Sequence, residues 1–176
     1  MKKLPLAICC LAMLSACSSS VTHRDTVSGQ PRTTSERQFT GAISNVSVVL
    51  SNDAKEKVKD NAKFDQDELA ITVERMLKGQ SLLSNTAQSR MEIVVTDMRT
   101  RSSFTAIAFG FMAGDDRVEG TVNIYDSQNQ LLKSFDVKAS YALGGLGGGM
   151  DNTRMSWLYE EFAKLTVNEL TGKSAE

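Results

Sequence analysis

The alternation of hydrophobic and polar residues predicts a strand at the start of the folded region. Between residues 40 and 50, Val46, Val48 and Leu50 alternate with Ser47 and Val49. A period of two residues is typical of a strand with one buried face. The stretch 51–63 that follows is polar and mostly charged, which indicates a solvated connection or a frayed helical turn.

The clearest helix start in the chain is at Asp65. Asp65 can cap a helix together with Glu68, and Phe64 precedes the cap where it can meet Leu69. This spacing combines a capping box with a hydrophobic staple. One helical face then carries the hydrophobic residues Leu69, Val73, Met76 and Leu77. We expect Gly79 to end this helix.

Three more strands and a second helix follow. The run at 93–95 within residues 91–99 predicts a strand buried on both faces, and the helix before it implies a right-handed parallel crossover. Residues 117–125 and 131–142 alternate on either side of a polar turn, which predicts a hairpin with one wet face. The last helix, 153–170, has the stripe Met155, Leu158, Phe162 and Leu165 and is expected to end at Gly172.

These elements predict an α/β (α+β) fold. Their order, β-α-β-β-β-α, predicts a two-layer sandwich in which two helices cover one face of a four-stranded mixed sheet. The segment 39–176 is long enough to bury a core without staples, so we expect one domain there.

The N-terminus has the pattern of an exported lipoprotein. Residues 1–16 carry two lysines and a short apolar run, which is typical of a signal peptide. The sequence Leu14-Ser15-Ala16-Cys17 resembles the lipobox of bacterial lipoproteins, in which the cysteine receives diacylglycerol and an N-acyl chain such as palmitate. The absence of aspartate at Ser18 then implies an outer-membrane anchor, with the domain facing the periplasm. The alternative is an ordinary signal cut after Ala16 that leaves a free Cys17.

Residues 17–38 contain almost no apolar side chains and predict a flexible tether that spans roughly 25 Å. The single histidine, His23, falls within it. Removal of residues 1–16 leaves 18 basic and 21 acidic residues, a net charge of about −3, which argues against a nucleic-acid surface. It also leaves no cysteine beyond Cys17, so we expect no thiol chemistry, metal site or bound cofactor apart from the lipid.

A glycine cluster precedes the last helix, at Gly144, Gly145, Gly147, Gly148 and Gly149. A phosphate-binding loop would need lysine and a hydroxyl where Met150 and Asp151 stand. Nucleotide binding is therefore not expected. The glycines are interpreted as a tight turn into the helix or as a loop that a partner orders.

The stretch 102–116 is unusually apolar for a connection between strands. Its large apolar residues are Phe104, Ile107, Phe109, Phe111 and Met112. They either extend the neighbouring strands and pack inside, or form an exposed lip that docks a partner or a second copy. Asp115 and Asp116 follow. Paired carboxylates could hydrolyse or bind a glycan, although aspartates in turns usually serve turn geometry.

The segments FGFMAGDDRVEGTVNIYD at 109–126 and LLKSFDVKAS at 131–140, with the glycine cluster, resemble the bacterial lipoproteins of the DUF4410 family. The resemblance covers most of residues 40–172 and implies no catalytic residues. The element order is also similar to small periplasmic domains of secretion-pore and envelope-assembly lipoproteins, which bind other proteins. We therefore expect a non-enzymatic outer-membrane lipoprotein that binds an envelope component, or itself, through the apolar lip or a sheet edge. A glycan hydrolase or carbohydrate-binding protein using Asp115 or Asp116 is the alternative.

Overall fold

A computed structural model describes residues 19–24, 39–61, 63–101, 115–141 and 151–173 of the chain. Its fold is mixed α+β, as expected, with one sheet and, within these residues, three α-helices. The sheet has five strands rather than four, in the order β1-β5-β4-β3-β2. Four of them match the predicted strands: β2 (Ile43–Leu50), β3 (Ser89–Arg99), β4 (Asp116–Tyr125) and β5 (Leu131–Tyr141).

The directions of these four strands follow the expected connections. The strands β2 and β3 are parallel and are joined through α3 (Gln66–Gly79), as a crossover requires. The strands β4 and β5 form the predicted antiparallel hairpin. A β-bulge lies between Val95 and Asp97 of β3.

The fifth strand, β1 (Ser20–His23), comes from the segment whose composition predicts a tether. It pairs antiparallel with β5, so that Val21 lies opposite Val137. Val21 packs against the core. Ahead of β1, the Ser19 hydroxyl accepts a hydrogen bond of 3.1 Å from the backbone N–H of Ser140. Part of the expected tether is therefore an edge strand of the sheet.

The start of α3 lies where its sequence predicts, although the backbone N–H of Asp65, which a capping box would pair with Glu68, donates to the Tyr159 hydroxyl instead. The carboxylate of Asp65 accepts hydrogen bonds from the backbone N–H groups of Asp67 and Glu68, and Phe64 and Leu69 are both buried. The helix also ends where the sequence predicts, since Gly79 is its last residue. The left-handed backbone conformation lies two residues beyond it, at Ser81, with φ of 57°.

Two further helices complete the fold. The short helix α2 (Asn52–Lys57), capped by the Ser51 side chain, forms within the polar stretch after β2. The last helix, α5 (Asp151–Thr171), ends at Gly172 as expected, with φ of 68°. Beyond it, the N–H of Lys173 donates to the carbonyl of Asn168 at 3.0 Å, the bond that identifies a Schellman motif.

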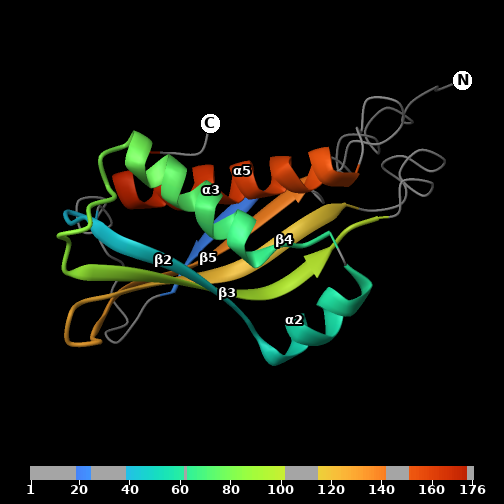
Figure 1. The fold of residues 1–176 in the computed structure, drawn as a ribbon, viewed down its shortest axis with the longest axis horizontal. Helices are drawn as coiled ribbons and strands as arrows, with labels where there is room; N and C mark the ends of the chain where they lie inside the picture. Colours follow the sequence, from blue (N-terminus) through green and yellow to red (C-terminus); the bar gives the residue numbers. More distant parts are fainter. Residues whose placement is uncertain (1–18, 25–38, 62, 102–114, 142–150, 174–176) are drawn as a thin grey trace, which may run out of the picture.

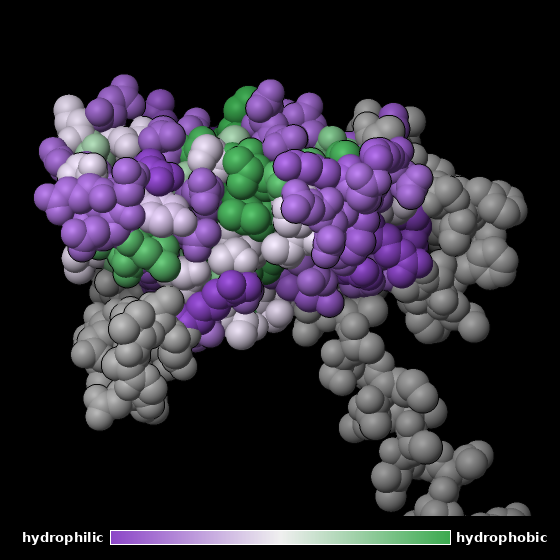
Figure 2. Space-filling model, turned by 90° about the horizontal axis from the view of Figure 1, so that it is seen from below, coloured by the Kyte–Doolittle hydropathy of each residue, from purple (hydrophilic) through white to green (hydrophobic). Residues whose placement is uncertain are grey.

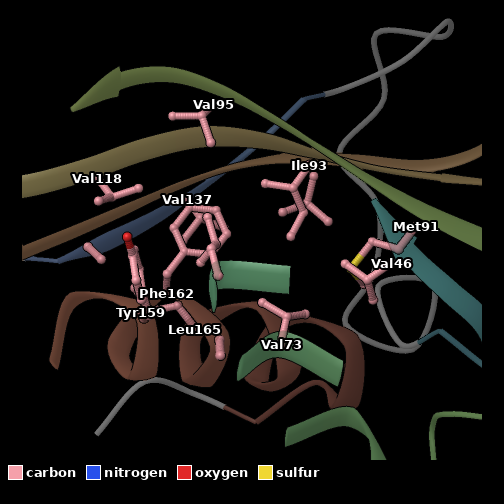
Figure 3. Packing of buried hydrophobic residues seen from close by; sticks show 14 of the residues in the cluster. Val46, Val73, Met91, Ile93, Val95, Val118, Val137, Tyr159, Phe162 and Leu165 are labelled. Carbon is pink, nitrogen blue, oxygen red and sulfur yellow. The ribbon is translucent and has the colours of Figure 1, made fainter. Parts of the chain in front are cut away.

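The helices α3 and α5 cover one face of the sheet, and α2 lies apart from this layer beside β3 (Figure 1). Between the layers, side chains of α5 such as Phe162 and Leu165 meet strand residues including Val118 and Val137 (Figure 3). Gly120 of β4 makes room for this packing. A Cβ added there would lie 3.0 Å from the Val94 carbonyl oxygen and 3.5 Å from the Phe162 ring.

The other face of the sheet is the wet face that the alternation predicts. Figure 2, seen from this side, shows hydrophilic residues around a small hydrophobic strip. Val49 of β2 lies opposite Val94 of β3 on this face, and Val49 is 41% exposed. No helix in the described part of the chain has the length and apolar character needed to cross a membrane.

The outer edge of β2 is occupied by groups from the same chain. The Glu74 carboxylate accepts a hydrogen bond from the Val46 N–H at 3.2 Å, and the Gln66 side chain donates to the Val48 carbonyl at 3.1 Å. At the strand's start, the backbone of Ile43 bonds with Leu82 and Ser84. Because these contacts already occupy backbone groups of β2, they disfavour the addition of a strand from another chain at this edge.

Candidate functional site

The site residues expected from the sequence divide into two groups. Three sets lie outside the described residues: Cys17; the apolar residues Phe104, Ile107, Phe109, Phe111 and Met112; and the glycines Gly144, Gly145, Gly147, Gly148 and Gly149. Asp115 and Asp116 are described. The polar centre of the molecule is built around the second of these.

Asp116 is the first residue of β4, and its side chain is completely buried. Its carboxylate accepts hydrogen bonds from the Arg101 backbone N–H at 2.6 Å and from the Arg101 guanidinium at 3.2 Å. The Arg154 guanidinium donates to the same carboxylate at 2.8 Å and is also completely buried. One carboxylate thus lies between two guanidinium groups inside the protein, and we call these three residues the buried charge cluster.

The buried charge cluster joins chain positions that are far apart in the sequence. Arg154, near the start of α5, also donates to the carbonyl oxygen of Arg101 at 2.9 Å. Arg101 donates to the carbonyl oxygen of Tyr141, the last residue of β5, at 3.3 Å. The residues that flank the apolar stretch and the glycine cluster are therefore held together at one end of the sheet.

Burial limits the acid–base chemistry that Asp115 and Asp116 could carry out. A general acid or base must reach the substrate or a water molecule, whereas the Asp116 side chain has no exposed surface and contacts two guanidiniums. Asp115 is 8% exposed and lies 3.5 Å from Arg117. Asp126 serves a turn, since its carboxylate accepts from the N–H groups of Gln128 and Gln130 at 2.8 Å.

A row of charged side chains crosses the wet face of the sheet. Asp97 accepts hydrogen bonds from Lys57 and, at 2.7 Å, from Arg117. Burial opposes ionisation of Asp97, but the hydrogen bonds and the positive charges of Lys57 and Arg117 together outweigh it and lower the pKa of Asp97. Next to them, Glu119 lies 3.5 Å from Arg117 and 3.2 Å from Lys138. Opposite charges alternate along this row.

A shallow hollow of about 360 Å³ lies on the same face, between β1 and the middle of the sheet. Its charged residues are engaged with one another: Arg24 lies 2.8 Å from Asp136, and Lys138 contacts Glu119. The Thr121 hydroxyl also donates to Asp136 at 2.7 Å. The hollow is polar, and its charges already balance in pairs.

The histidine predicted to lie in the tether belongs to the sheet. His23 is the last residue of β1, and its Nδ1 atom lies 3.3 Å from the Glu169 carboxylate of α5. Lys133 of β5 contacts the same carboxylate oxygen at 2.7 Å. Across the described residues, no three His, Cys, Asp or Glu side chains are grouped so that they could hold a metal ion.

The aromatic residues of α5 have two different environments. Tyr159 is 2% exposed, and its hydroxyl accepts a hydrogen bond of 2.7 Å from the backbone N–H of Asp65. Burial raises the pKa of Tyr159 to about 12. Trp157 is 41% exposed and packs against Tyr141, with ring centroids 5.0 Å apart and the ring planes tilted by 56°. We call Tyr141 and Trp157 the aromatic pair.

The family described as a domain of unknown function, DUF4410, matches residues 20–145. The chain belongs to this family. In this DUF4410 chain the match begins at Ser20, the first residue of β1, so the edge strand is part of the family domain. No curated protein matches the chain.

Two solved structures have a similar fold. One is the PelC dodecamer from Paraburkholderia phytofirmans, with a TM-score of 0.51 and 12% sequence identity over 88% of this DUF4410 chain and 98% of that chain. The other is the dodecamer of a point variant of the same protein, with a TM-score of 0.49 and 11% identity over the same shares. At 11–12% sequence identity, this similarity shows a shared fold alone.

The buried charge cluster was not predicted from the sequence, although the sequence holds a signal for it. Asp116 is in phase with the buried residues Val118 and Val122 of β4. Arg154 precedes Leu158 by four residues and so falls on the apolar stripe of the last helix. Opposite charges at buried positions of two elements indicate that the two side chains meet.

Proposed function

We propose that this protein is an outer-membrane lipoprotein, acylated at Cys17, whose periplasmic domain acts by assembling with envelope proteins, further copies of itself included. The anchor is supported by the order of the N-terminal features: basic residues, a short apolar run and the Leu14–Cys17 box. In this proposal the domain assembles with other proteins and does not catalyse a reaction.

The observation that carries the assembly role is the fold shared with PelC over nearly all of both chains. PelC is a dodecamer, so this architecture supports packing between copies. The proposal extends that capacity to the present chain. Faces and ends of the domain, and not the β2 edge, would form the contacts, because side chains of α3 occupy that edge.

The glycan hydrolase alternative receives no support from the aspartate pair. A glycosidase needs two carboxyl groups on either side of a bond that the substrate can place between them. Asp116 is buried between the guanidinium groups of Arg101 and Arg154, and Asp115 lies beside Arg117.

The test uses the full chain produced in a Gram-negative host and extracted in mild detergent. Mass spectrometry of the N-terminal peptide should show Cys17 with three acyl chains, and native mass spectrometry should show oligomers or a complex with envelope proteins. Cys17→Ser is the matched control and should lose the lipid. An unmodified Cys17, a lone monomer without partners, or sugar release from peptidoglycan fragments would contradict the proposal.

A further inference from the structure

We infer that the end of the domain that carries Ser19, Tyr141 and Trp157 rests on the surface of the lipid bilayer, so that the domain has one fixed orientation at the membrane. This inference rests on the proposed acylation of Cys17. It assigns the aromatic pair the role of a membrane contact.

The first step is the distance between the anchor and the folded domain. Ser19 is fixed by its hydrogen bonds with Ser140, and β1 begins at the next residue. Only two residue steps separate Cys17 from Ser19, and an extended chain spans about 7 Å in two steps. A flexible tether of some 20 residues would reach roughly 25 Å. The lipid therefore holds this end of the domain against the headgroups.

The second step is the attachment of β1 to β5. The short distance from Cys17 to Ser19 fixes the orientation of the domain only if β1 stays on the sheet. Val21 packs against the core opposite Val137. At the far end of the strand, Arg24 makes two hydrogen bonds of 2.8 and 2.9 Å to the Asp136 carboxylate. Contacts on both faces of β1 thus keep it on β5.

The third step is the chemistry of the surface at this end. Tyr141 follows Ser140 directly, and the ring of the exposed Trp157 packs against the Tyr141 ring at a tilt of 56°. Tryptophan and tyrosine are enriched at membrane–water interfaces because their rings are apolar and their N–H or O–H groups are polar. The opposite end of β5, at Leu131, is ten residues away, about 34 Å along a strand. One end of the domain can touch the bilayer while the other end stays clear of it.

The experiment uses the fact that Trp157 is the single tryptophan of the chain. The acylated full chain is reconstituted into vesicles of phosphatidylethanolamine and phosphatidylglycerol that contain a lipid brominated near the headgroup or deep in the acyl chain. We expect the shallow quencher to lower the tryptophan emission about twofold and the deep quencher to act more weakly, as for an interfacial ring.

Two variants serve as matched controls. In Trp157→Phe with Leu131→Trp the reporter moves to the far end of β5, at a position that is already 44% exposed. Its emission should be unaffected by either quencher. In the second variant about twenty glycine and serine residues are inserted between Ser18 and Ser19, which lengthens the tether to roughly 25 Å. This variant should keep its lipid and lose the quenching of Trp157.

The outcomes separate the inference from the proposed function. An acylated protein whose Trp157 is not quenched, or is quenched no more than tryptophan at position 131, overturns the orientation and leaves the lipoprotein proposal standing. Shielding of Trp157 by a second copy belongs to this case, since its emission would be blue-shifted in detergent and insensitive to lipid quenchers. An unmodified Cys17 overturns both.

Discussion

The Nη1 atom of Arg154 lies 2.8 Å from the Oδ2 atom of Asp116, and both side chains are completely buried. The pair joins the first turns of α5 to the first residue of β4, 38 residues apart in the sequence. Arg101, two residues beyond the end of β3, contacts the same carboxylate. The start of α5 is thereby fixed over one end of the sheet, close to the aromatic pair.

Replacement of the buried carboxylate should destabilise the fold strongly. In Asp116→Asn the two buried guanidinium groups lose their counter-charge, and removal of one partner from a buried ion pair costs about 3–5 kcal/mol. The free energy of unfolding, measured by urea denaturation with circular dichroism, should fall by that amount.

Asp115→Asn is the matched control for this prediction. Asp115 has one longer contact, 3.5 Å from Arg117, and Arg117 keeps Asp97 and Glu119 as partners, so the loss should be smaller, about 1–2 kcal/mol. Equal losses of unfolding free energy in the two variants would mean that the buried charge cluster contributes no more to stability than the Asp115–Arg117 ion pair.

Detachment of β1 should be measurable at β5. In Val21→Asp a carboxylate replaces a side chain that packs against the core, and the strand should leave the sheet edge because burial of an unpaired charge is costly. Hydrogen exchange at Asp136 and Lys138 should become at least about tenfold faster, because their N–H groups lie on the same side of β5 as that of Ser140, which donates to Ser19. Thr22→Ser, on the exposed face of β1, should leave exchange unchanged. Slow exchange at these amides in Val21→Asp would show that β1 does not protect them.

Two glycines at helix ends should respond to alanine in opposite directions. Gly79 is helical and a Cβ there would meet no atom within 4 Å, so Gly79→Ala should raise the free energy of unfolding by about 0.5–1 kcal/mol. Gly172 has φ of 68°, which alanine tolerates poorly, so Gly172→Ala should lower it by about 1 kcal/mol. Thermal unfolding of both variants gives the comparison. A loss of stability in Gly79→Ala would contradict the helical geometry at that position.

Stability should fall in alkaline solution through Tyr159. Burial raises its pKa to about 12, whereas a tyrosine in the unfolded chain titrates near about 10. A raised pKa in the folded state stabilises the protein fully below the unfolded pKa, and this contribution is lost as the pH rises from about 10 to about 12. Urea unfolding at several pH values should show this decline.

Tyr159→Phe is the control for the alkaline decline. The variant should lose about 1 kcal/mol at neutral pH, because the Asp65 N–H loses its acceptor. Above pH 10 its stability should then depend less on pH than that of the parent. Burial raises the pKa of Tyr141 as well, and since both proteins contain Tyr141, their difference isolates Tyr159. Parallel curves would rule out Tyr159 as the source.

The sequence predicted those elements whose signals are local. Asp65 and Phe64 mark the start of α3, and the alternation from Arg117 to Tyr141 gives the β4–β5 hairpin with its wet face. Gly172 marks the end of α5. In each case a repeat of two or 3.6 residues, or a cap within one turn, carries the information. Gly79 likewise marks the end of α3, although the left-handed residue is Ser81, two positions later.

Only the tertiary structure decided what the polar and charged residues do. By its composition, the segment around Ser20 reads as a tether, and it becomes a strand because β5 offers an unpaired edge and a place for Val21 more than a hundred residues later. Asp116 and Arg154 are tolerable inside the protein only because each meets the other there. Local patterns determine which segments are helices and strands. Pairing between distant segments depends on the packing of the whole chain, and the pairing of β1 with β5 placed Ser19 on Ser140, next to the aromatic pair.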